Sequence, residues 1–120
     1  MSSILIVDDQ VGIRLLLNEV FQNEGLNTYT ASNGLEALQI FEEKQLDCIL
    51  LDVKMPGMDG IETLNTIRKT NKNIPVYMMT AYGEQDLIDS ANKLHVEKFF
   101  TKPFNIFEVR DSVLNFLQQR

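Results

Sequence analysis

Polar residues that could act together in catalysis follow four short apolar runs in this 120-residue chain. Asp8 and Asp9 come after ILIV, Asp52 after CILL, Thr80 after VYMM, and Lys102 two positions after a pair of phenylalanines. An apolar run that stops at an acid and enters a Pro/Gly turn is typical of a buried strand presenting a carboxylate to a loop. A lone strand-end aspartate is as often a turn or helix cap, so its assignment depends on the rest of the chain.

The elements that must position these residues alternate along the whole chain. Apolar runs predict strands at residues 4–7, 26–31, 48–51, 76–79 and 99–100. Each run is followed by apolar residues at helical spacing, and Asn33, Asp59 and Asn105 each precede a glutamate by three positions, as a helix cap does. Strands that alternate with helices predict an α/β fold, with a parallel sheet covered on both faces. We expect residues 1–120 to form a single domain with no output domain.

Parallel strands bring their carboxyl ends to one edge of the sheet, which is where open α/β sheets bind ligands. Asp8, Asp9, Asp52, Thr80 and Lys102 should therefore converge. Two like charges about 4 Å apart repel by about 4 kcal/mol at an effective dielectric of about 20, so clustered acids require a cation. Hard oxygen ligands in a wet site favour Mg²⁺, for which Mn²⁺ could substitute.

The residue types in this cluster suit phosphoryl transfer. A carboxylate can itself be the nucleophile and become an aspartyl phosphate. Asp52 is then the phosphoacceptor, Lys102 is the fixed cation that offsets charge on the phosphoryl oxygens, and the Thr80 hydroxyl donates a hydrogen bond to one of those oxygens.

Composition narrows the possible partners. The formal net charge of -6, with no run of Lys or Arg, argues against binding to nucleic acid or to an anionic membrane. Cys48 is the only cysteine, so no intramolecular disulfide can form, and its neighbours suggest a reduced, buried residue. The chain has neither a signal-peptide pattern nor an apolar run of membrane-spanning length, and we expect a cytoplasmic location.

The ordered motifs resemble the receiver domain of two-component response regulators over the full length of the chain. The resemblance rests on the acidic pair at 8–9, the strand ending at Asp52, the MPGMDG loop at 55–60, Thr80 with Ala81, and KPF at 102–104. Within that family, the segment QVGIR at 10–14 and Lys54 most resemble the single-domain receivers of sporulation phosphorelays.

The resemblance implies a flavodoxin-like (βα)₅ fold with strand order 2-1-3-4-5. It implies that Mg²⁺ is held by Asp9, Asp52 and the backbone carbonyl of Lys54, with Asp8 acting through water. The peptide bond before Pro103 is expected to be cis.

The resemblance also implies a switch that couples Thr80 to the aromatic residue at position 99. Many members of the family carry tyrosine there, and Phe99 lacks its hydroxyl.

The implied function is that of a stand-alone receiver in a phosphorelay. It would accept a phosphoryl group from the phosphohistidine of a sensor kinase onto Asp52 and pass it to a histidine phosphotransferase. It would be an enzyme in the limited sense of catalysing its own phosphorylation and dephosphorylation, and an aspartyl-phosphate phosphatase is a further partner class. The expected partner-contact residues are Gln10, Gly12, Ile13, Leu16, Met55, Tyr82 and Pro103.

Three other functions were weighed against the relay. A receiver that acts by phosphorylation-dependent binding to a target, as in chemotaxis, stays open. A dehalogenase-type phosphatase is disfavoured because Lys54 stands where that chemistry needs a second acid. A flavin-binding module is disfavoured because Asp8 and Asp9 would repel the flavin phosphate.

Overall fold

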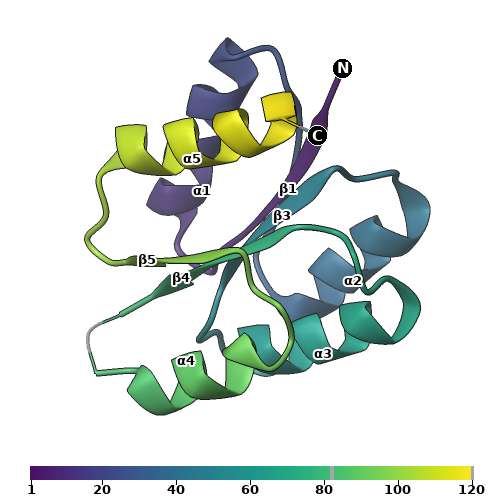
Figure 1. Ribbon diagram of the computed structural model, residues 1–120, viewed down its shortest axis with the longest axis vertical. Helices are drawn as coiled ribbons and strands as arrows, with labels where there is room; N and C mark the ends of the chain where they lie inside the picture. Colours follow the sequence, from purple (N-terminus) through teal and green to yellow (C-terminus); the bar gives the residue numbers. More distant parts are fainter. Residues whose placement is uncertain (82, 120) are drawn as a thin grey trace.

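The computed structural model describes residues 1–81 and 83–119 and shows strands and helices in strict alternation (Figure 1). The elements are β1 (Ser3–Val7), α1 (Val11–Asn23), β2 (Asn27–Ala31), α2 (Gly34–Glu43), β3 (Cys48–Asp52), α3 (Gly60–Thr70), β4 (Val76–Thr80), α4 (Gln85–Asn92), β5 (Lys98–Thr101) and α5 (Ile106–Gln119). None of the helices in these two ranges combines the length and the apolar character that crossing a membrane requires. The α/β prediction is confirmed.

The strands form one parallel sheet in the order β2-β1-β3-β4-β5, as the resemblance implied. Their register aligns the carboxyl ends, because Val7 lies opposite Leu51, Asp52 opposite Met79, and Thr80 opposite Thr101. Polar residues that follow these strands consequently lie at one edge.

The sheet is covered on both faces, which explains why β1, β3 and β4 are buried along their whole length. Helices α1 and α5 pack on one face, and α2, α3 and α4 pack on the other (Figure 1). Each large side chain that becomes fully buried contributes about 1.5–3 kcal/mol to stability. The fully buried side chains in these two layers include Leu5, Leu51, Met78, Leu17, Phe21 and Leu50.

The predicted helix caps are confirmed. The side-chain oxygens of Asn33, Asp59 and Asn105 accept hydrogen bonds from backbone N–H groups at the start of α2, α3 and α5. The second strand begins at Asn27 and not at Leu26, because the Leu26 N–H donates back to the carbonyl of Phe21 at the end of α1. Gly25 makes this reversal possible with a φ of 86°.

Candidate functional site

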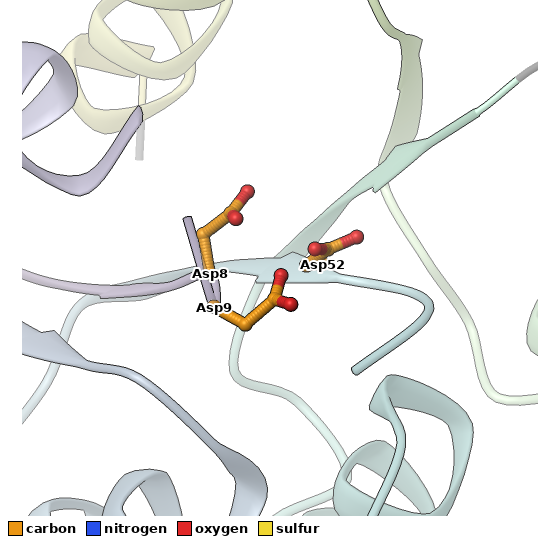
Figure 2. A group of neighbouring side chains, drawn as sticks. All are labelled: Asp8, Asp9 and Asp52. Atoms are coloured by element: carbon orange, nitrogen blue, oxygen red, sulfur yellow. The ribbon is translucent and has the colours of Figure 1, made fainter. Parts of the chain in front are cut away.

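Three carboxylates meet at the carboxyl ends of β1 and β3, as predicted (Figure 2). Asp8, Asp9 and Asp52 each offer an oxygen atom, and these three atoms lie within 4.8 Å of one another. Asp8 is 0% and Asp52 is 5% exposed, whereas Asp9 faces solvent. We call these three residues, together with Lys102, the acidic site.

Lys102 reaches the acidic site from the loop after β5. Its Nζ lies 2.9 Å from Oδ2 of Asp8 and 3.3 Å from Oδ2 of Asp52, so a single ammonium group neutralises part of the charge of two acids. Burial alone lowers the pKa of Lys102, but its hydrogen bond to Asp8 and the charges of both acids raise the pKa above its ordinary value. The predicted convergence of lysine and carboxylates is confirmed, and the Lys102–Pro103 peptide bond is cis.

The electrostatics of Asp52 differ from those of an exposed aspartate. Burial, and then the negative charge of Asp8, raise the pKa of Asp52 to about 7, and Lys102 offsets part of this increase. Its Oδ1 accepts only a long hydrogen bond of 3.4 Å from the Lys54 N–H. Asp52 is therefore a weakly solvated carboxylate with acceptor capacity to spare, as a nucleophile or a metal ligand requires.

Both carboxylate oxygens of Asp8 accept short hydrogen bonds, unlike those of Asp9 and Asp52. Its Oδ1 accepts a hydrogen bond of 2.9 Å from the Gln10 N–H, and its Oδ2 binds Lys102. Asp9 and Asp52 thus retain the freer oxygens at the opening of the acidic site. A set of hard carboxylate oxygens beside an exposed loop fits Mg²⁺.

The backbone at Asp52 is packed against the start of α3. The Gly60 N–H donates a hydrogen bond of 2.8 Å to the carbonyl of Val53. A Cβ at Gly60 would lie 2.0 Å from the carbonyl oxygen of Asp52, which only glycine avoids. The last glycine of the MPGMDG motif is therefore needed for close packing, in addition to the turn that the motif forms.

Thr80 ends β4 with its side chain fully buried. Its Oγ1 has no hydrogen-bond partner, an uncommon state for a buried hydroxyl. Thr80 lines a cavity of about 350 Å³ together with Glu84 and Ile88 of the β4–α4 region. Phe99 lies opposite Met78 on the neighbouring strand, two positions from Thr80 in β4, so both predicted switch residues are on one face of the sheet. Their coupling stays a prediction.

Four of the predicted partner-contact residues surround one groove of about 530 Å³. These are Gln10, Ile13, Leu16 and Pro103, and Phe104 forms part of the same apolar wall. Gly12 is exposed on α1, and Tyr82 lies outside the described residues. Two further apolar residues of α1, Val11 and Leu15, are 60% and 63% exposed.

The structure contradicts the prediction that Met55 contacts a partner. Met55 is only 5% exposed and packs with Val53 and Leu64 in the core beneath the loop. The loop after β3 folds back onto the sheet, so its first methionine completes the core instead of reaching solvent. Met55 is therefore removed from the partner surface.

The sequence analysis does not predict the roles of two residues, Glu84 and Arg68. The Glu84 carboxylate accepts a hydrogen bond of 2.5 Å from the Ala81 N–H, at the edge of the acidic site. Arg68 is 8% exposed and donates to the carbonyls of Ile74, Leu94 and His95, which joins α3 to two loops at the far end of the sheet. An arginine in the last turn of a helix suits such carbonyls, but its partners lie too far along the chain to be predicted from spacing.

Comparisons with protein families, with curated proteins and with solved structures all find similar proteins. The family model for the response regulator receiver domain matches residues 4–114. Sporulation initiation phosphotransferase F of Bacillus subtilis is 54% identical over 95% of this chain and 92% of its own length. Regulatory protein AtoC of Escherichia coli is 38% identical over 98% of this chain, which spans only 24% of that longer relative. The solved structure of the Vibrio cholerae chemotaxis protein CheY4 matches 99% of this chain and 98% of its own chain, with a TM-score of 0.85 and 30% identity.

Proposed function

The chain belongs to the response regulator receiver family, and we propose that it is a phosphorelay intermediate whose Asp52 accepts and then donates a phosphoryl group. The single observation that carries this proposal is the acidic site. Asp52 is held beside Asp8 and Asp9 at one opening, and Lys102 reaches across to two of these acids. No purely structural role requires three carboxylates to share one opening, since their mutual repulsion opposes folding.

In the proposed reaction, an Asp52 carboxylate oxygen attacks the phosphorus of a phosphohistidine on a sensor kinase. One O–P bond forms and the P–N bond breaks; the histidine ring keeps the electron pair of that bond and takes up a proton from water. Lys102 offsets the charge on the phosphoryl oxygens, and the unpaired Thr80 hydroxyl is available to donate to one of them. Transfer to a histidine phosphotransferase is the same exchange in reverse, with a different histidine.

The residues proposed to hold Mg²⁺ are Asp9, Asp52 and the backbone carbonyl of Lys54, with Asp8 acting through water. The observed donor set supports this assignment, because Asp9 and Asp52 have freer oxygens than Asp8. Bound Mg²⁺ would offset negative charge on the carboxylates and the phosphoryl oxygens. Mn²⁺, with similar oxygen preferences, could substitute.

The proposed partners are a sensor histidine kinase, a histidine phosphotransferase and an aspartyl-phosphate phosphatase. The apolar groove beside Lys102, lined by Ile13, Leu16 and Pro103, supports docking of another protein next to the reacting aspartate. The high identity to a sporulation phosphotransferase over nearly all of both chains favours the relay over output by binding alone. Action in the cytoplasm stays a prediction.

A first experiment tests the phosphoacceptor. We expect wild-type protein incubated with acetyl phosphate and Mg²⁺ to gain the mass of one phosphoryl group, and Asp52→Asn to gain none. Intact-protein mass spectrometry measures both. Stoichiometric labelling of Asp52→Asn under the same conditions would refute the assignment.

A second experiment separates the relay from a binding output. Protein phosphorylated by a kinase domain is mixed with candidate histidine phosphotransferases, and radiolabel is followed on a gel. Rapid loss of label from the receiver, with its appearance on the phosphotransferase, supports the relay. Stable binding to a target without transfer would support the chemotaxis-like alternative.

A further inference from the structure

The side chain of Glu84 is turned toward the acidic site although Glu84 belongs to the start of α4. Its backbone carbonyl accepts hydrogen bonds from the N–H groups of Leu87 and Ile88, as the first carbonyl of a helix does. Its carboxylate makes no capping bond to α4 and instead accepts the Ala81 N–H, at 2.5 Å. A carboxylate bonded to a backbone N–H is a strong, charge-assisted contact. Glu84 therefore ties the start of α4 to the end of β4.

The hydrogen bond between Glu84 and Ala81 lies close to the reacting carboxylate of Asp52. One cavity of about 240 Å³ is shared by the acidic site and by the contact between Glu84 and Ala81. Its lining residues are Asp9, Gln10, Asp52, Lys54, Ala81, Glu84 and Lys102. Glu84 is thus the third carboxylate that lines this cavity, beside Asp9 and Asp52. Lys102 is already engaged by Asp8 and Asp52, and within residues 1–81 and 83–119 no lysine or arginine forms an ion pair with Glu84.

We propose that Glu84 is an internal competitor of the phosphoryl group for the Ala81 N–H. This inference rests on the proposed phosphorylation of Asp52. A phosphoryl group on Asp52 brings oxygens that carry negative charge into the cavity that Ala81 and Glu84 line. Those oxygens repel the Glu84 carboxylate and accept the N–H that it occupied, and the Glu84 side chain moves to solvent.

Two consequences follow from this competition. Before phosphorylation, Glu84 slows the reaction, because its charge repels the incoming phosphodonor and its oxygen occupies a donor. After phosphorylation, the tie between the end of β4 and the start of α4 is broken. Glu84 and Ile88 also line the cavity beside the buried Thr80 hydroxyl, so loss of this tie changes the surroundings of Thr80 as well.

The test compares Glu84→Gln and Glu84→Ala with wild type. Glutamine keeps the size and an acceptor oxygen but removes the charge, whereas alanine removes both. The matched control is Asp86→Asn, which removes one negative charge from an exposed residue of the first turn of α4. We expect the rate of labelling by acetyl phosphate in Mg²⁺ to rise about threefold to tenfold in Glu84→Ala and less in Glu84→Gln. Asp86→Asn should label at the wild-type rate.

A second measurement needs no phosphorylation. The Ala81 amide of the unmodified protein, followed by ¹⁵N NMR, should resonate downfield in wild type and move upfield in Glu84→Ala but not in Asp86→Asn. In phosphorylated Glu84→Ala, the Ala81 amide should return downfield, because a phosphoryl oxygen then accepts its hydrogen bond.

The two measurements distinguish the possible failures. Equal labelling rates in wild type and both Glu84 variants would overturn the competition, as would an Ala81 amide that phosphorylation leaves unchanged in Glu84→Ala. If wild type itself is not labelled, the proposed function is refuted and the competition with it. The amide shift of the unmodified protein would then still report whether the contact between Glu84 and Ala81 exists.

Discussion

Replacing Asp52 by asparagine should stabilise the metal-free protein, and the gain should depend on pH. The change is nearly isosteric and removes one ionisable group from the acidic site. In the wild type, Nζ of Lys102 lies 2.9 Å from Oδ2 of Asp8. Asp8 is unchanged in the variant, so Lys102 keeps an ion-pair partner. The difference between the two proteins therefore reports the cost of ionising Asp52.

The magnitude follows from the pKa of Asp52, which burial and the negative charge of Asp8 raise from 3.8 to about 7. The folded chain binds this proton more tightly than the unfolded chain does. The contribution of Asp52 to stability is thus fully present below about pH 4 and is lost as pH rises through about 7. Three pKa units correspond to about 4 kcal/mol. Because the opening admits water, which screens the charge, we expect roughly half, about 2 kcal/mol.

The assay is thermal unfolding in chelator at pH 5 and pH 8. At pH 8, Asp52→Asn should melt about 8 °C above wild type, which is what about 2 kcal/mol amounts to in a domain of this size. At pH 5 roughly two thirds of that difference should vanish, because ionisation of Asp52 then opposes folding only over the interval between 3.8 and pH 5. Asp86→Asn serves as the control, because an exposed aspartate should change the melting temperature little at either pH.

One result would refute the reasoning. If Asp52→Asn and wild type differ by the same amount at pH 5 and pH 8, the ionisation of Asp52 is not opposed by folding. The acids would then be better solvated, or further apart, than the structure places them.

Three further predictions concern the metal, the lifetime of the phosphoryl group and the partner. Mg²⁺ should raise the melting temperature of wild type by binding the folded state, and Asp9→Asn should reduce that increase. Differential scanning calorimetry measures both proteins with Mg²⁺ and in metal-free buffer that contains a chelator. Lys54→Asn should shorten the lifetime of phospho-Asp52 several-fold in a radiolabel decay assay, since the exposed lysine stem no longer obstructs the attacking water; unchanged decay would contradict this. Ile13→Ala should impair transfer to a histidine phosphotransferase and leave acetyl-phosphate labelling intact, because Ile13 lines the groove and not the acidic site; wild-type transfer would move the partner to another face.

The sequence predicted the fold and the acidic site because both depend on simple regularities. Apolar runs that end in polar residues define parallel strands, and parallel strands bring their ends together whatever the details of the loops. Asp52 and Lys102 are 50 positions apart, yet the strand order places both at one edge of the sheet, where the lysine Nζ reaches to 3.3 Å from the carboxylate.

The loops were harder to predict because their backbone conformation has no period. Met55 was expected on the surface, since methionine beside Pro and Gly suggests an exposed turn, but the loop folds back and buries it. The bond between Glu84 and Ala81 depends on how the chain turns between β4 and α4. Neither residue type nor spacing distinguishes that carboxylate from those of exposed glutamates.

The close packing of Gly60 on the Asp52 carbonyl makes the two sides of the reacting aspartate mechanically unequal. On the β3–α3 side, the backbone cannot shift without moving a helix whose Leu64 and Ile67 are buried in the core. On the β4–α4 side, the Glu84 carboxylate accepts the Ala81 N–H, and this side-chain contact can break without moving the buried Ala91 of α4. Proteins that sense the phosphorylated state should therefore bind near α4, whereas proteins that exchange the phosphoryl group can use the groove beside α1. Sensing and exchange would then use adjoining surfaces that meet at Ala81, which lines the groove and also contacts Glu84.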